Sequence, residues 1–273
     1  MTTAALLESS IPTPGSAALQ SRLWGARARD WAEIQEPMVA PLYNSALKYL
    51  EPPDGKRLLD AGCGSGVFCA LAAAAGHEVS GCDATPALLA IARTRLPTVN
   101  FLEADLEQLP FPNQAFDAVT GFNSFQYAAT PLNALREAHR VLKRGGLLIM
   151  ATWGRPENCE AAPYLRALAA LLPQPAAGAP GQFDLSADGA MRQLATQAGF
   201  KTQAELETLT VWDYPDEATA LRGLLSAGPA IRAINHAGGE AVTDAVRRVL
   251  AGFQQPSGRF QMRNTFRYVL ARK

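Results

Sequence analysis

One short motif constrains this sequence more than any other: a buried strand that runs directly into three alternate glycines. The strand, residues 58–61, contains a single charged residue, Asp60, and Gly62, Gly64 and Gly66 follow it. Glycine lets a backbone turn tightly and lets a ligand approach it closely. In open α/β sheets, ligands bind where a strand crosses into a helix. The motif therefore predicts a binding loop at the carboxyl end of a parallel strand.

Strand and helix patterns alternate around this loop. Short apolar runs with strand character lie at residues 57–61, 78–82, 99–103, 116–121 and 147–152, with helical patterns between them. Such alternation is typical of a parallel sheet with right-handed crossovers. Two later strand patterns, at residues 202–212 and 266–271, complete the set. We therefore expect an α/β fold with a Rossmann-like, mostly parallel seven-stranded sheet and helices on both faces.

The remaining segments predict additions to that sheet. Residues 17–34 and 38–50 have helical apolar spacing, and residues 215–254 contain three short helical patterns. We expect four parts, which are an N-terminal arm and helical lid (1–55), a ligand-binding core (56–213), a helical cap insertion (214–262) and a final core strand (263–273).

Two further acidic residues follow the next two strands. Asp60, Asp83 and Asp105 are each about one strand–helix unit apart, so all three should meet at the carboxyl edge of the sheet. Asp60 suits a cationic ammonium group, Asp83 suits the vicinal hydroxyls of a ribose, and Asp105 suits the amine of adenine. S-adenosylmethionine presents these three groups. A GxGxxG fingerprint for a dinucleotide is absent, because Val67 stands where its third glycine belongs.

Over residues 56–152 the chain resembles the class I S-adenosylmethionine-dependent methyltransferases, in particular the small-molecule, type 11-like branch. The resemblance rests on the Asp60–Gly66 motif, on Asp83 and Asp105, and on the segment 107–112 before Phe116. It implies a cofactor-binding set made of Asp60, Gly62, Cys63, Gly64, Gly66, Asp83, Ala84, Asp105, Leu106, Asn123, Trp24 and Trp31. The two tryptophans share one face of a regular helix, and simple core packing is the alternative for both.

The methyl acceptor is less well indicated. Residues that follow strand ends on the ligand side are candidates to line its pocket, and they are Phe125, Gln126, Tyr127 and Trp153. The C-terminal segment is basic, and Arg263 is the candidate there for an anionic acceptor. His236 is a weak candidate for a general base. We expect no metal site, since the four cysteines form no ligand cluster with histidine.

The amino-acid composition indicates which classes of binding partner and which cellular compartment are expected for this chain. The chain has 25 Lys and Arg against 25 Asp and Glu, and its formal net charge is zero, which disfavours nucleic acid as a partner. No run of about 18 apolar residues indicates a membrane span. Four scattered cysteines and the lack of a signal-peptide pattern favour the cytoplasm. The oligomeric state stays open.

The sequence thus predicts an enzyme that transfers a methyl group from S-adenosylmethionine to an O, N or C nucleophile of a small, partly apolar molecule. Two alternatives remain at this point. One is a nicotinamide-dependent oxidoreductase on a related sheet, and the other is a non-catalytic methyltransferase-like module.

Overall fold

The computed structural model describes residues 15–50, 55–174, 181 and 183–273. The strands are β1 (Arg57–Ala61), β2 (Glu78–Asp83), β3 (Asn100–Glu103), β4 (Phe116–Phe122), β5 (Leu142–Trp153), β6 (Lys201–Tyr214) and β7 (Phe260–Arg272). The helices are α1 (Ala17–Gly25), α2 (Ala28–Asp30), α3 (Ala40–Leu47), α4 (Val67–Ala74), α5 (Pro86–Arg95), α6 (Pro131–Val141), α7 (Ala162–Ala170), α8 (Ala190–Gln197), α9 (Glu217–Leu224), α10 (Gly228–Ala237) and α11 (Gly239–Leu250). Short helical turns are η1 (Trp31–Gln35), η2 (Glu36–Val39), η3 (Phe125–Tyr127), η4 (Pro156–Asn158), η5 (Asp184–Ser186) and η6 (Ala251–Phe253).

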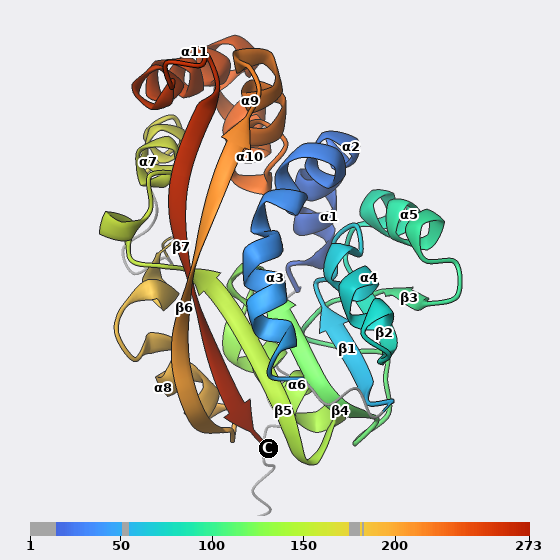
Figure 1. Ribbon diagram of the computed structural model, residues 1–273. Coiled ribbons are helices and arrows are strands. Elements are labelled where there is room, and N and C mark those ends of the chain that lie inside the picture. Colours follow the sequence, from blue (N-terminus) through green and yellow to red (C-terminus); the bar gives the residue numbers. More distant parts are fainter. Residues whose placement is uncertain (1–14, 51–54, 175–180, 182) are drawn as a thin grey trace, which may run out of the picture.

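The seven strands form one sheet in the order β3-β2-β1-β4-β5-β7-β6 (Figure 1). Pairs among β1 to β5 are parallel, and β7 runs antiparallel to both β5 and β6. The predicted mostly parallel, seven-stranded Rossmann-like sheet is confirmed. Because β1, β2 and β4 run in one direction, the residues that follow them meet at one edge, which faces α1 and α2 in Figure 1.

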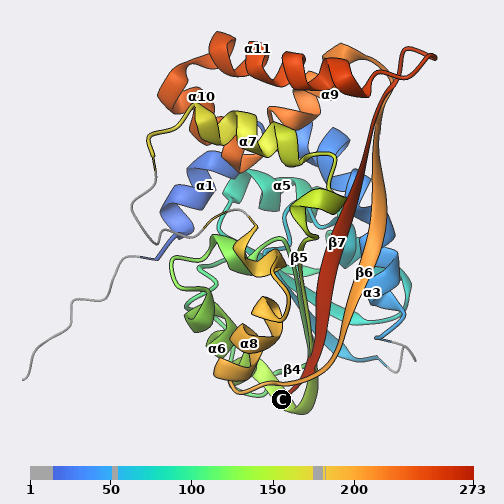
Figure 2. The same ribbon diagram turned by 90° about the vertical axis from the view of Figure 1, so that its left-hand side faces the viewer.

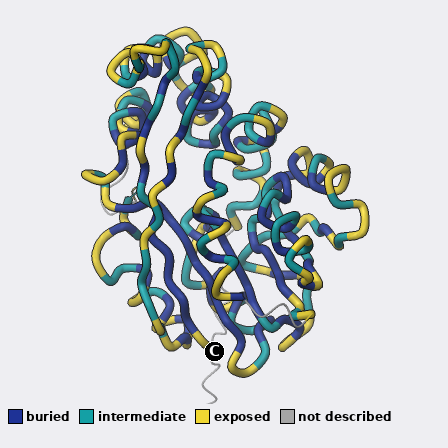
Figure 3. Tube along the Cα trace, viewed as in Figure 1, coloured by how far each residue is buried: buried dark blue, intermediate teal, exposed yellow. Residues whose placement is uncertain are grey.

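Helices cover both faces of the sheet. Alternate β5 side chains divide between two apolar clusters, with Leu147 and Ile149 in the cluster of α3, α4 and α5, and Leu148 and Met150 in the cluster of α6 and α8. This alternation follows from the period of two in a strand. Figure 3 shows the central strands buried along much of their length, with the exposed positions on helices and turns.

The strands β6 and β7 extend beyond the rest of the sheet, and α9, α10 and α11 lie between them in the chain. Figure 2 shows these helices, together with α7, as a layer at the end of that long hairpin. The last strand begins at Phe260, earlier than the expected residue 263, because Phe260 pairs with Tyr214 of β6.

The N-terminal region is helical, but its prediction as one regular helix over residues 17–34 is wrong. The helix breaks at Arg27, whose φ of −135° and ψ of 42° are not helical, and it resumes as α2. A π-helical turn, η1, follows. The second expected helix, 38–50, is divided between η2 and α3. Residues 1–14 and 51–54 of the expected arm and lid lie outside the described residues.

Candidate active site

The glycine loop after β1 is held by the neighbouring strand. The amides of Gly62 and Cys63 both donate to the carbonyl of Cys82, at 2.8 and 2.9 Å. Gly62 has a φ of +82°, and a Cβ there would collide with the side chain of Ser124. Only glycine fits this conformation and this close approach. The loop therefore leaves bare backbone at the edge of the sheet.

Asp60 lies beneath this loop. Its Oδ1 accepts a hydrogen bond from Thr120 Oγ1 at 2.8 Å, and its Oδ2 faces the Cys69 thiol at 3.6 Å. Only 2% of the residue is exposed. Burial raises the pKa of Asp60 to about 7, against the lowering effect of those two hydrogen bonds. A cation at this position would stabilise the ionised carboxylate.

Asp83 ends β2 and fixes two loops. Its Oδ2 accepts from the Gly64 amide and its Oδ1 from the Thr85 amide, each at 2.9 Å. Burial raises the pKa of Asp83 as well. A carboxylate has about four lone-pair positions, so these two hydrogen bonds do not by themselves exhaust its capacity to accept from the hydroxyls of a ligand.

Asp105 follows β3 and meets the N-terminal helix. Its Oδ1 accepts from the Glu107 amide at 2.9 Å, and its Oδ2 accepts from the Ala17 amide at 3.3 Å. The start of α1 therefore lies directly over this carboxylate. Asp60, Asp83 and Asp105 were expected at one edge of the sheet, and all three line one cavity.

That cavity encloses about 920 Å³, part of it open to solvent. Eleven of the twelve predicted cofactor residues line it, namely Asp60, Gly62, Cys63, Gly64, Asp83, Ala84, Asp105, Leu106, Asn123, Trp24 and Trp31. Gly66 does not. It precedes α4 with a φ of +79°, and a Cβ there would press on Ala92 and Phe101, so its place is the packing of α4 against α5 and β3.

Sequence reasoning missed Glu36. This lid residue is 3% exposed, lines the same cavity, and its Oε2 accepts from the Ser65 amide at 3.1 Å. Burial raises its pKa to about 7, although the Ser65 hydrogen bond and the charge of Arg95 lower it. The π-helical turn explains the omission: the Glu36 amide bonds to the Trp31 carbonyl, so residues five apart share a face. A regular helix would turn Glu36 away.

Glu36 also affects which ligands fit. It places a carboxylate at the N-terminus of α4, the position where dinucleotide-binding folds hold a pyrophosphate. Together with Asp60 and Asp83 it makes this end of the cavity acidic. A pyrophosphate would meet these carboxylates, whereas an ammonium group would not be repelled.

A second cavity of about 480 Å³ adjoins the first. The two share five lining residues, which are Trp24, Trp31, Val39, Asn123 and Tyr127. Trp24 contacts Trp31 edge to face, with ring centroids 4.7 Å apart, and Tyr127 in the same way at 5.5 Å. Both tryptophans are therefore cavity walls as well as packing residues. Asn123, with a left-handed φ of +51°, stands at the end of β4 between the two spaces.

The residues predicted for the acceptor divide into two groups. Tyr127 lines both cavities and Trp153 lines the second. The structure does not bring Phe125, Gln126, Arg263 or His236 to either cavity. Phe125 is in the core of the α6 and α8 face, and Gln126 donates to Asn123 Oδ1 at 3.0 Å. Arg263 is exposed on β7, and His236 is exposed near the end of α10.

The described residues 15–50, 55–174, 181 and 183–273 also bear on membrane insertion and metal binding. No helix there has the length and apolar character that a membrane crossing requires. Within the same residues, no group of three or more His, Cys, Asp or Glu is arranged to hold a metal ion.

Comparison with known proteins gives one family and many relatives. Residues 59–150 match the family described as "Methyltransferase domain". The chain is 30% identical over 174 residues to a malonyl-[acyl-carrier protein] O-methyltransferase of Serratia marcescens, covering 64% of each chain. It is 43% identical over 107 residues to a demethylmenaquinone methyltransferase of Thermus thermophilus, covering 37% of this chain and 49% of that one. Both matches span less than two thirds of the relative's length.

Among solved structures, the YcgJ protein from Bacillus subtilis has a similar fold. The TM-score is 0.56 at 20% sequence identity, over 85% of this chain and 97% of that one. At this identity the likeness speaks for the fold alone. Residues 59–150, which run from β1 to β5, match the methyltransferase domain family, and with the seven-stranded sheet this part of the chain is similar to the class I S-adenosylmethionine-dependent methyltransferases.

Proposed function

We propose that this protein transfers a methyl group from S-adenosylmethionine to a nucleophilic O, N or C atom of a small, partly apolar molecule by in-line displacement. The observation that carries the proposal is the meeting of Asp60, Asp83 and Asp105 in one cavity that adjoins a second, mainly apolar one. Donor and acceptor would thus occupy adjoining spaces, and the acceptor atom would meet the methyl group where the two cavities join, beside the lining residues that they share.

The residues of the first cavity fit this cofactor. Asp60 beneath the glycine loop would hold the methionyl ammonium group, and Asp83 would accept hydrogen bonds from the ribose hydroxyls. Asp105 would accept a hydrogen bond from the adenine amine. The bare backbone at Gly62 and Gly64 allows close approach. When bound, the cofactor supplies a methyl group on a sulfonium, which is already activated for transfer.

The chain itself would contribute alignment and exclusion of water. Aligning two reactants can lower a barrier by roughly 7–11 kcal/mol. Trp24, Trp31 and Tyr127 form the wall common to both cavities and would orient the acceptor toward the methyl group. Among the described residues that line the second cavity, the titratable side chains are tyrosines. An acceptor that loses its own proton readily would therefore suit this site best.

Each part of the chain would have its own role in this reaction. The core, residues 56–213 with the final strand at 263–273, would hold the cofactor, while the lid (1–55) and the cap (214–262) would enclose the acceptor. We place the protein in the cytoplasm, and the four buried cysteines, all with free thiols, support a reducing compartment. The zero net charge supports an acceptor other than nucleic acid, and the lack of a run of about 18 apolar residues supports the proposal of no membrane partner.

Calorimetric titration with S-adenosylhomocysteine and with NADH tests the cofactor. We expect binding of S-adenosylhomocysteine and none of NADH, because Glu36 occupies the N-terminus of α4. Tight binding of NADH alone would favour the oxidoreductase alternative instead. Transfer of a labelled methyl group to a panel of small acceptors then separates an enzyme from a non-catalytic module.

A further inference from the structure

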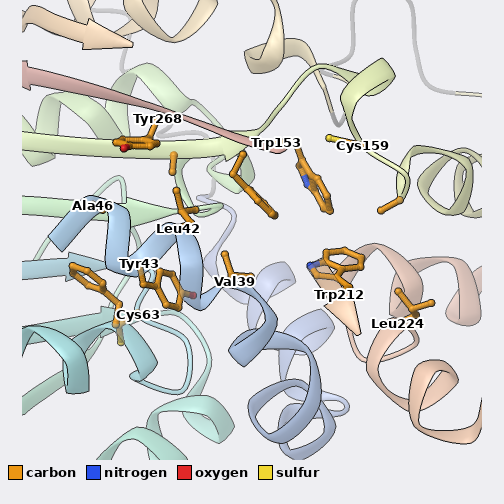
Figure 4. Packing of buried hydrophobic residues seen from close by; sticks show 14 of the residues in the cluster. Val39, Leu42, Tyr43, Ala46, Cys63, Trp153, Cys159, Trp212, Leu224 and Tyr268 are labelled. Atoms are coloured by element: carbon orange, nitrogen blue, oxygen red, sulfur yellow. The ribbon is translucent and has the colours of Figure 1, made fainter. Parts of the chain in front are cut away.

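The walls of the second cavity are largely aromatic. Trp153 stacks on Phe266 with ring centroids 4.9 Å apart and meets Trp212 edge to face at 5.5 Å. Trp24, Trp31 and Tyr164 add further rings to the lining. Figure 4 shows Trp153 and Trp212 projecting toward the same space from opposite sides. Faces and edges of this kind favour a flat ring as the occupant.

The lining carries no formal charge. Its described residues include no Asp, Glu, Lys, Arg or His. Most of its polar groups already have partners. The Tyr164 hydroxyl donates to the Leu224 carbonyl at 2.7 Å, and Gln35 Oε1 accepts from the Tyr214 hydroxyl at 2.7 Å. An aromatic wall alone could also attract a cation, so a further observation must decide the charge of the occupant.

That observation is the indole N–H of Trp212. The residue is 4% exposed, and its Nε1 is buried without a hydrogen-bond partner among the described residues. Figure 4 shows this nitrogen on the side of the ring toward Val39, another residue of the cavity lining. Burying an N–H group without a hydrogen bond is unfavourable, and a ligand oxygen that accepts from it would remove this cost. An ammonium group can only donate hydrogen bonds, so it could not accept one from the indole N–H.

We propose that the acceptor is a flat aromatic compound without positive charge that carries an oxygen, such as a carbonyl, accepting a hydrogen bond from Trp212 Nε1. This inference rests on the proposed function, since it takes the second cavity as the acceptor site. Trp212 does not line the first cavity, so its oxygen partner lies apart from the atom that receives the methyl group.

Three matched probes test the inference in the presence of S-adenosylhomocysteine. They are 6-acetyl-2-naphthol, 6-ethyl-2-naphthol and 6-aminomethyl-2-naphthol, which share a ring system and differ in one group. We expect the acetyl compound to bind about tenfold more tightly than the ethyl compound, and the protonated amine to bind most weakly. In Trp212→Phe, which keeps a ring but lacks the N–H, the difference between the acetyl and ethyl compounds should disappear.

Tyr164→Phe is the matched control, because its hydroxyl is already bonded to Leu224 and the acetyl preference should survive there. The inference is overturned if the amine binds best, if Trp212→Phe keeps the acetyl preference, or if none of the probes binds while S-adenosylhomocysteine does. Failure of S-adenosylhomocysteine itself to bind would instead count against the proposed function.

Discussion

Asp83 combines two tasks in one side chain. It holds the Gly64 and Thr85 amides, and it lines the cavity with its remaining lone pairs. Asp83→Asn removes one acceptor oxygen and the negative charge. The hydrogen bonds to the ribose hydroxyls should therefore weaken, and the affinity for S-adenosylhomocysteine should fall by about tenfold to a hundredfold. Calorimetry with S-adenosylhomocysteine measures this effect.

Asp117→Asn is a suitable control for that measurement. Asp117 is also a strand carboxylate that accepts a backbone hydrogen bond, from Arg57 at 3.0 Å, but it does not line the cavity. Its replacement should leave the cofactor affinity unchanged. Equal losses in both variants would show that Asp83 acts only through the fold, and the ribose assignment would be dropped.

Asp60 should make cofactor binding depend on pH. Burial raises the pKa of its carboxyl to about 7, whereas a bound ammonium group would lower it again. The ionised form binds, so affinity for S-adenosylhomocysteine should rise by about tenfold between pH 5.5 and 7.0. Asp60→Asn should bind weakly with a shallower profile, because Glu36, whose pKa is also about 7, remains in the same cavity. A wild-type affinity that stays constant over this range would contradict the ammonium assignment.

At the scale of elements, the sequence predicted the sheet well and the lid poorly. Five strands of the core were legible because each is a short apolar run bounded by turns, and the acids after β1, β2 and β3 followed from the parallel order. The lid was misread because the break at Arg27 and the π-helical turn η1 depart from regular helical geometry, and the spacing of apolar residues signals neither departure. Trp31 and Glu36 share a face only in that turn, so helical periodicity could not place Glu36.

The π-helical turn should depend on Glu36 for its position. Glu36→Ala leaves the buried Ser65 amide without its acceptor, which costs about 1–3 kcal/mol. We expect faster amide hydrogen exchange over residues 31–39 and affinity for S-adenosylhomocysteine about tenfold lower. Glu33→Ala is the matched control, since Glu33 lies in the same turn and is exposed. If the two variants exchange alike, Glu36 does not hold the lid.

At the scale of the whole molecule, buried carboxyls make the folded state sensitive to pH in an unusual direction. Burial raises the pKa values of Asp60 and Glu36 to about 7, so between about pH 4 and pH 7 the folded state binds more protons than the unfolded state. The free energy of unfolding should therefore fall as pH rises through this window. For Asp60 alone, a pKa raised from 3.8 to about 7 corresponds to about 4 kcal/mol.

Two histidines have the opposite effect on how the free energy of unfolding changes with pH. Burial lowers the pKa values of His77 and His139, so their contribution to stability is lost as pH falls below about 6.5. The carboxyls should dominate, because burial raises the pKa values of both Asp60 and Glu36 to about 7. Below about pH 4, stability falls again as Asp117 and Glu137, whose pKa values are lowered by Lys143 and Arg140, take up protons.

Urea unfolding at pH 5.0 and 7.5 measures the balance. Wild-type protein without cofactor should be less stable at pH 7.5 by several kcal/mol, and Asp60→Asn should lose much of this difference because it cannot ionise. Saturating S-adenosylhomocysteine should also reduce the difference, since ligand affinity and stability report the same proton on Asp60. A wild-type stability that rises from pH 5.0 to 7.5, with Asp60→Asn behaving identically, would mean that Asp60 is already ionised in the free protein. The cofactor would then meet a carboxylate that is stabilised by its surroundings alone.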